Sequence, residues 1–133
     1  MALMDEVGGF WMRSFRALRT AHVVLEDEDY DSAVSESYYA AFYAVKALFL
    51  LEEREFKTHK ALDRAVNLDL VRTRRWPKSL AVLYREMMKD RNLADYESLS
   101  QFTKRQAETA IKSAWKIVRA VQATRPDVFV ILK

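Results

Sequence analysis

Three short segments of the chain carry side chains that could do chemistry. Three phenols fall at Tyr38, Tyr39 and Tyr43, and they are followed by the step Thr58-His59-Lys60 and by the run Arg91-Asn-Leu-Ala-Asp-Tyr96. A histidine can accept or donate a proton near neutral pH, and an arginine can stabilise negative charge that grows during a reaction.

The same side chains also have structural interpretations, which stay open at this point. Aromatic packing accounts for phenols on an otherwise apolar helix, and each buried hydroxyl then requires a partner, so a polar seam or a subunit contact is expected there. A histidine beside a lysine at the start of a helix is typical of a surface or capping pair.

A basic stretch lies between the second and third segments. It places four cations around Trp76 and Pro77, so it could hold the phosphate backbone of RNA while the indole stacks on a base. Exposed loops are also rich in arginine simply because they are solvated, and we favour that interpretation. The candidate phosphate-binding residues are Arg72, Arg74, Arg75 and Lys78.

The charges of the chain are unevenly distributed. Residues 1–53 carry four basic and ten acidic side chains, whereas residues 54–133 carry eighteen basic and nine acidic ones. Such a split can mark a nucleic-acid face, or it can let the acidic half pack against the basic half of the same bundle or of a partner chain. Sequence alone does not choose between these two arrangements.

Composition excludes several classes of site. The chain has no cysteine and only two histidines, and it lacks a phosphate-binding glycine loop and a zinc-binding His-Glu-x-x-His helix, so we expect no cofactor and no metal. Carboxylates could still hold a divalent ion in the run Asp27, Glu28, Asp29 and Asp31, but a solvated acidic turn is the preferred interpretation. The absence of cysteine, of a basic signal segment and of a long apolar run predicts a cytoplasmic protein without a membrane span.

Hydrophobic periodicity predicts an all-α protein. Only two glycines and two prolines occur, and apolar residues recur at three- and four-residue steps along most of the chain. Asp31 or Ser32 is expected to cap the second helix, and Thr58 the third. The first helix should bury Trp11 and His22 on one face. The expected helices span residues 10–25, 33–51, 58–68, 79–89 and 99–123.

These helices predict an up-and-down bundle of four to five helices in a single domain spanning residues 1–133. The core of the domain should comprise about residues 10–124. The apolar tail at 125–133 is too short to fold alone, so we expect it to dock on the bundle or on a partner chain.

Taken together, the three segments resemble the HEPN family, particularly its small stand-alone members. The shared features are a Tyr-Tyr-Ala-Ala-Phe helix, a Ser/Thr-His-Lys step and an Arg-x-x-Ala-Asp-Tyr signature, and the resemblance covers about residues 10–122. It implies a helical bundle like the substrate-binding domain of nucleotidyltransferases. It also implies a homodimer, because ribonuclease members of the family build one cleft from two copies.

The resemblance carries over to the site only in part. Ribonuclease members place a histidine four to six residues after an arginine; here Arg91 and Asn92 match the start of that motif, while Tyr96 stands in place of the histidine. A tyrosine with an ordinary pKa of about 10 is ionised in about one molecule in a thousand at pH 7, so it is a poor base. Glu36 also departs from the arginine that many relatives carry before the Tyr-Tyr pair. Both changes favour a weakened or absent nuclease.

The remaining matched residues suggest support for an interface. Asp95 can pair with Arg91 or with a tyrosine hydroxyl across the dimer contact. The residues expected to support the site or the interface are Tyr38, Tyr39, Tyr43, His59, Asn92 and Asp95.

Three functions therefore compete. The first, which the resemblance implies, is a homodimeric binding or regulatory module that associates with a minimal nucleotidyltransferase, as in toxin and antitoxin pairs, or that binds RNA or a nucleotide. The second is a metal-independent endoribonuclease that uses Arg91 with Tyr96, and with His59. The third is nucleotide binding alone, with phosphates on the basic stretch and the base stacked on Trp76 or a tyrosine.

Overall fold

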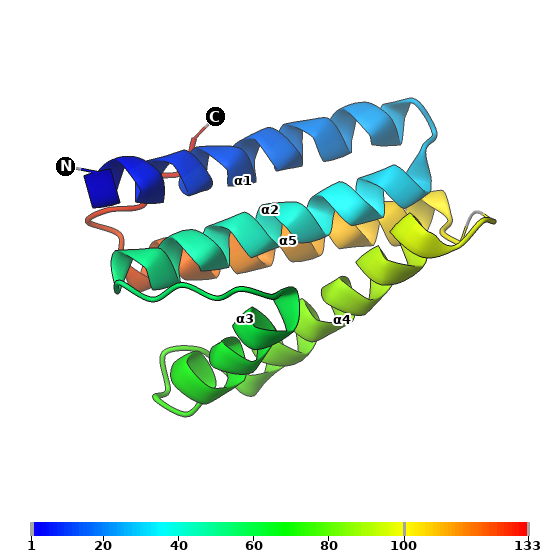
Figure 1. The fold of residues 1–133 in the computed structure, drawn as a ribbon. Coiled ribbons are helices and arrows are strands. Elements are labelled where there is room, and N and C mark those ends of the chain that lie inside the picture. The colour runs from blue at the N-terminus through cyan, green and yellow to red at the C-terminus, as the bar shows by residue number, and fades with distance from the viewer. Residues whose placement is uncertain (1, 100, 133) are drawn as a thin grey trace.

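The structure is a computed structural model that describes residues 2–99 and 101–132, and all regular secondary structure within them is helical (Figure 1). The all-α expectation is therefore confirmed. A short π-helical segment, η1, continues the third helix directly. The elements are α1 (Ala2–Glu26), α2 (Tyr30–Leu51), α3 (His59–Ala65), η1 (Val66–Val71), α4 (Lys78–Tyr96) and α5 (Lys104–Thr124).

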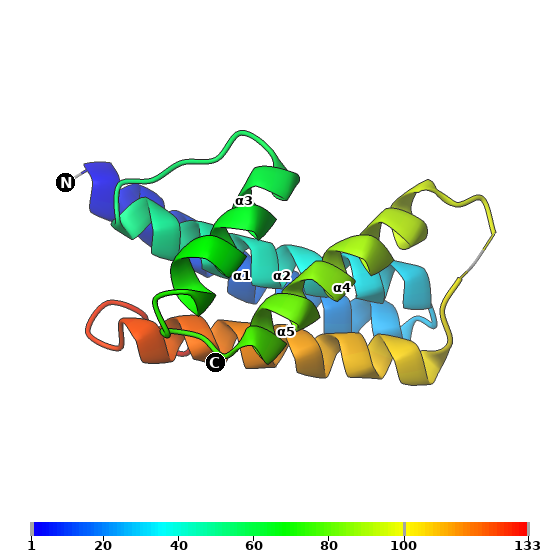
Figure 2. The same ribbon diagram turned by 90° about the horizontal axis from the view of Figure 1, so that it is seen from below.

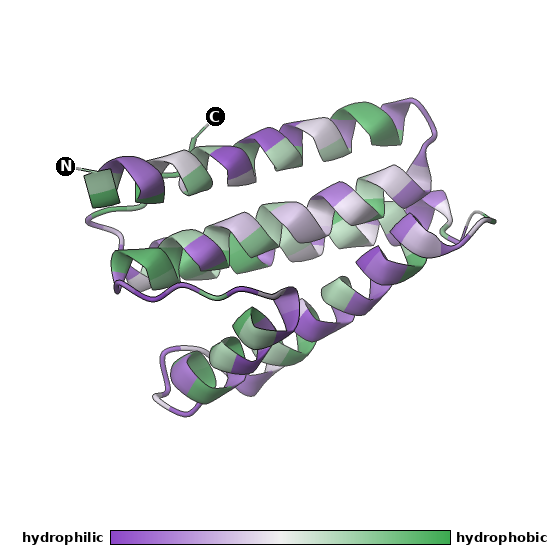
Figure 3. Cartoon of the chain, in the orientation of Figure 1, coloured by the Kyte–Doolittle hydropathy of each residue, from purple (hydrophilic) through white to green (hydrophobic). Residues whose placement is uncertain are grey.

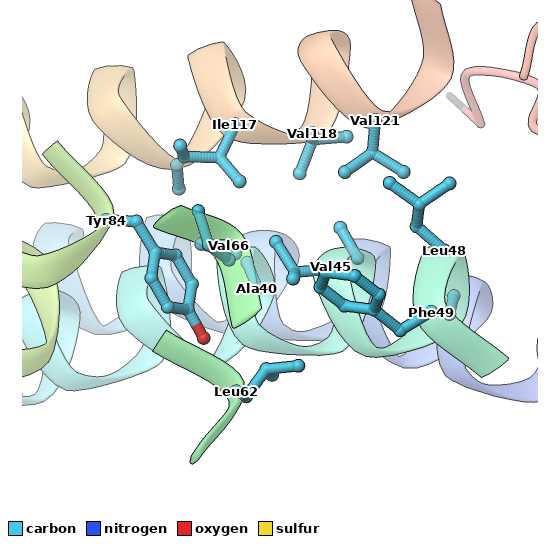
Figure 4. Packing of buried hydrophobic residues seen from close by; sticks show 14 of the residues in the cluster. Ala40, Val45, Leu48, Phe49, Leu62, Val66, Tyr84, Ile117, Val118 and Val121 are labelled. Atoms are coloured by element: carbon cyan, nitrogen blue, oxygen red, sulfur yellow. The ribbon is translucent and has the colours of Figure 1, made fainter. Parts of the chain in front are cut away.

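Helix α2 is the centre of the bundle, and it contacts α1, α4 and α5. Figure 1 shows α1, α2 and α5 running alongside one another, while α3 and α4 pack beneath them. Figure 4 shows Val45, Leu48 and Phe49 of α2 directed at α5 and at Leu62 and Val66. This position explains why α2 is apolar on most of its circumference, whereas α1 and α4 expose polar residues outward (Figure 3).

The turn before α2 differs in detail from the sequence expectation. Asp29, rather than Asp31 or Ser32, caps α2, because its carboxylate accepts hydrogen bonds from the backbone N and the hydroxyl of Ser32. Asp31 instead accepts from the backbone N of Gln101 and of Phe102, each at 3.1 Å in its shortest contact. The acidic run thus ties the start of α2 to the segment before α5. Thr58 caps α3 as expected.

The observed end of α4 and the observed start of α5 differ from the expected boundaries because of packing and capping. Helix α4 continues past residue 89 to Tyr96, so the Arg91–Tyr96 motif lies on its last two turns. Helix α5 starts at Lys104, not at residue 99, because Thr103 and Gln106 form a reciprocal capping box there.

Helix α1 begins at Ala2, eight residues earlier than expected. Gly8 and Gly9 lie inside it, and the buried side chain of Val7 holds this first part of the helix on the core. Packing therefore overrides the low helix propensity of the two glycines. His22, expected on the buried face, is exposed.

The C-terminal tail docks on α1. The ring of Phe129 is buried and lies 4.7 Å from that of Trp11, measured between centroids. The indole N–H of Trp11 also donates to the backbone oxygen of Val130 at 2.8 Å. The tail therefore closes one end of the bundle in this chain itself.

None of the helices in the described ranges is long and apolar enough to cross a membrane.

The glycine pair in α1 gives a stability prediction. Neither Gly8 nor Gly9 has a positive φ, and a Cβ at either position would meet no atom within 4 Å. Gly8→Ala and Gly9→Ala should each raise the free energy of unfolding by about 0.5–1 kcal/mol, because alanine restricts the unfolded chain and favours the helix. Denaturant titration followed by circular dichroism measures this change. Unchanged or lower stability in both variants would contradict a formed helix at these residues.

Candidate functional site

A buried hydrogen bond joins α2 to the start of α3. The hydroxyl of Tyr38, a side chain with no solvent exposure, lies 2.7 Å from Nδ1 of His59. Burial raises the pKa of Tyr38 to about 12, so the phenol keeps its proton at neutral pH. The polar seam expected on the tyrosine helix therefore exists, and His59 completes it. Tyr39 and Tyr43 lie on the same helix and remain partly exposed.

His59 is held as a neutral imidazole. Its ring lies 4.3 Å from that of Phe42, measured between centroids, and Thr58 caps the helix that begins with it. Burial lowers the pKa of His59, and the nearby charges of Arg91 and Lys46 lower it further. In a neutral imidazole, the nitrogen without a proton accepts a hydrogen bond, and the nitrogen that carries the proton donates one. The tautomer in which Tyr38 donates to Nδ1 leaves the proton of His59 on Nε2.

Arg91 is enclosed by aromatic rings. Its guanidinium carbon lies 5.3 Å from the ring centroid of Tyr38 and 5.5 Å from that of Tyr39. Its side chain is only 8% exposed, and its Nε–H is buried without a hydrogen-bond partner among the described residues. The guanidinium is therefore held by cation–π contacts more than by hydrogen bonds. We call Tyr38, Tyr39, His59, Arg91 and Asp95 the Arg91 cluster.

The other motif residues occupy different surroundings. Asp95 lies one turn beyond Arg91, with Oδ2 3.7 Å from a guanidinium nitrogen. Tyr96 ends α4 and is 75% exposed, although its ring centroid lies 6.0 Å from the guanidinium carbon of Arg91. Asn92 lies on an exposed position of α4. The structure thus brings Asp95 and Tyr96 to Arg91, while Asn92 faces solvent.

Two carboxylates reduce the positive charge of this region. Burial raises the pKa of Glu36, and the charge of Asp95 raises it further. Glu36 also lines a shallow groove between α1 and α2 with Arg13, Arg16 and Tyr43. An RNA phosphate beside Arg91 would meet these acidic groups as well as the cation.

The basic stretch lies apart from the Arg91 cluster. Lys78 starts α4, thirteen residues before Arg91, which is about 20 Å along a helix. Arg75 forms an ion pair with Glu52. Trp76 is only 3% exposed, so it does not offer the stacking surface considered for a nucleotide base. Arg72, Arg74 and Lys78 are exposed.

Sequence reasoning missed Lys46. Its ammonium lies 4.6 Å from the ring centroid of Phe10 and 5.7 Å from that of Phe42, and its charge acts on His59. A sequence signal was present, because Lys46 is the one cation on α2 and follows Tyr43 by three residues, one turn along the helix. Figure 2 shows how α3 and α4 lie across α2, which brings the three segments together.

The charge effect on His59 can be measured. Arg91→Met should raise the pKa of His59, because removing a nearby positive charge favours the imidazolium. Lys46→Met should raise it less, and Lys60→Met, whose charge is not among those that lower this pKa, should leave it unchanged. NMR titration of the imidazole nitrogens gives these values. The cluster geometry would be contradicted if Arg91→Met had no effect or if all three variants shifted the pKa equally.

Glu36 should make stability depend on pH. Because its pKa is raised in the folded protein, the folded state binds this proton more tightly than the unfolded chain does, and its contribution to stability falls as pH rises from 4.5 through the folded pKa. Glu36→Gln should therefore unfold at higher denaturant concentration than wild type at pH 7, with the difference shrinking towards pH 4.5. Glu108→Gln, on an exposed position of α5, serves as the control. A destabilised Glu36→Gln protein at pH 7 would contradict this prediction.

Two relatives and one family model match this chain. A UPF0332 protein from Thermotoga maritima is 32% identical over 124 residues, which cover 92% of this chain and 94% of that protein. A protein from Methanocaldococcus jannaschii named as a candidate toxin is 31% identical over 93 residues, covering 70% of this chain and 63% of that protein. The family model described as the HEPN domain matches residues 9–124. This match spans all three chemical segments and the helices that position them, and the chain therefore belongs to the HEPN domain family.

Proposed function

We propose that this chain is a homodimeric HEPN binding module that associates with a minimal nucleotidyltransferase and has little nuclease activity of its own. The observation that carries the proposal is the enclosure of Arg91. Its side chain is 8% exposed, and its guanidinium contacts tyrosine rings and Asp95. The family resemblance and the relative named as a candidate toxin support two parts of the proposal, the nucleotidyltransferase partner and the RNA or nucleotide ligand.

The surroundings of Arg91 argue against phosphate chemistry in this arrangement. To contact a phosphate, the guanidinium must leave the tyrosine rings and Asp95. The incoming phosphate would also approach Glu36 and Asp95, and like charges disfavour it. Tyr96 has no imidazole, so it is a weak proton acceptor at the position where ribonuclease members carry histidine.

The aromatic side chains next to the cluster fit a subunit contact. Phe10, Tyr39, Phe42 and Tyr43 are only partly buried, and their rings lie within about 6 Å of their neighbours. At the end of α4, Tyr96 adds exposed apolar surface beside Arg91. Aromatic residues and arginine are enriched where protein surfaces associate, so a second copy on this face would bury them.

A second candidate function is a metal-independent endoribonuclease that uses His59 in place of the missing histidine. The observation in its favour is that His59 is neutral and lies close to the charge of Arg91. In the tautomer whose Nδ1–H donates to the hydroxyl of Tyr38, Nε2 of His59 is free to take the proton of a 2′-hydroxyl. Arg91 could then stabilise the phosphate if it left Asp95. In this function the Arg91 cluster would rearrange when two copies meet.

Light scattering tests the dimer. The wild-type protein should be dimeric at micromolar concentration, and Tyr96→Glu should weaken association at least tenfold, because a charge would be desolvated in the contact. Val82→Glu, an exposed position fourteen residues earlier on α4, should remain dimeric. A monomeric wild-type protein, or equal weakening by both variants, would contradict the proposed interface.

An RNA-cleavage assay in EDTA separates the two functions. The binding-module proposal expects wild type to cleave no faster than Arg91→Ala or His59→Asn. Cleavage by wild type that is lost in both variants would instead establish the endoribonuclease. Circular dichroism of each variant confirms that the helices remain formed.

A further inference from the structure

A second groove lies on the other side of α1, between α1, α5 and the C-terminal tail. Its volume is about 660 Å³, and no residue of the Arg91 cluster lines it. Docking of the tail creates this groove, because the Trp11 hydrogen bond to Val130 holds the tail beside α1 (Figure 1). Ligand sites of drug-sized molecules have volumes of about 300–1,000 Å³, so the groove can hold a discrete small molecule.

One part of the groove is apolar. Met12 is 56% exposed there, and Leu132 is also exposed. The ring of Phe15 packs edge-on against that of Trp115 at 5.9 Å between centroids, and this pair forms the aromatic portion of the surface. The apolar lining residues are Met12, Phe15, Leu18, Trp115, Ile131 and Leu132.

The other part of the groove is basic, and no acidic residue lines it, although Arg16 also lines the α1–α2 groove that contains Glu36. Its polar lining residues are Arg16, Arg19, His22 and Arg119. None of the three arginines forms an ion pair with a described residue, and Arg119 instead lies 5.3 Å from the ring centroid of Trp115. No acidic residue occurs on α1 between Glu6 and Glu26, and α5 contains only Glu108. The groove therefore carries positive charge beside exposed apolar surface.

We propose that this α1–α5 groove binds an anionic amphiphile, a molecule with a carboxylate or phosphate head and an elongated apolar body. Arginine binds carboxylate and phosphate oxygens through paired hydrogen bonds, which accounts for the head. The body covers Met12, Leu132 and the exposed side of Trp115, which solvent would otherwise contact. A bare anion would leave this apolar surface in water, and a neutral amphiphile would leave the arginines without a partner.

Titration with dodecyl phosphate, kept below its micelle concentration, tests the proposal. Calorimetry should show saturable binding at one molecule per chain. Trp11 and Trp76 are buried, whereas Trp115 lines the groove, so the emission of wild type should change and that of Trp115→Phe should not. Arg16→Gln with Arg19→Gln should weaken binding at least tenfold, because two charged hydrogen-bond donors are lost.

Matched controls define the class of ligand. Lys57→Gln with Lys60→Gln removes the same charge from exposed positions near α3 and should change the affinity less than twofold. Inorganic phosphate and the neutral dodecyl maltoside should each bind at least tenfold more weakly than dodecyl phosphate. The proposal is overturned by the absence of binding heat, by equal affinity in the Arg16/Arg19 variant, or by equal binding of either control compound. Tighter binding of a single-stranded RNA that competes for the groove would also overturn it.

Discussion

The burial of most of α2 is the constraint on which the rest of this structure depends. Helices α1, α4 and α5 all pack on it, so the polar atoms on its buried sides must find partners inside the bundle. The hydroxyl of Ser14 on α1 donates to the backbone oxygen of Ala40 at 2.7 Å, and Tyr38 reaches His59 on α3. These bonds fix how α1 and α3 lie on α2, and hydrophobic burial alone would not specify their rotation.

The chemistry of the Arg91 cluster follows from this burial. Tyr38 and His59 are kept in their neutral forms because the interior disfavours charge, and the nearby guanidinium disfavours the imidazolium further. The same guanidinium lies against the rings of Tyr38 and Tyr39, and Asp95 balances its charge from the partly exposed end of α4. A cation held in this way serves the packing of α2 against α4.

The uneven distribution of charge has a limited structural role within one chain. Among the described residues, Arg75 with Glu52 joins the acidic first part of the chain to the basic second part, whereas pairs such as Arg85 with Asp63 lie within the second part. The two halves are therefore not held together mainly by attraction between their charges. Most cations remain on the surface, including the three arginines beside Trp115, where they are free to meet anions.

The sequence by itself determined the helical class, the order of the helices and the three segments that carry the chemistry, because hydrophobic periodicity and local motifs are properties of neighbouring residues. It did not reveal that α1 starts before Gly8, that α4 continues through the Arg91 motif, or that Trp76 is buried, since packing between distant segments decides these features. The enclosure of Arg91, the influence of Lys46 on His59 and the groove closed by the tail were likewise decided only in three dimensions. Each of them depends on distances between residues far apart in the chain, and sequence spacing does not contain those distances.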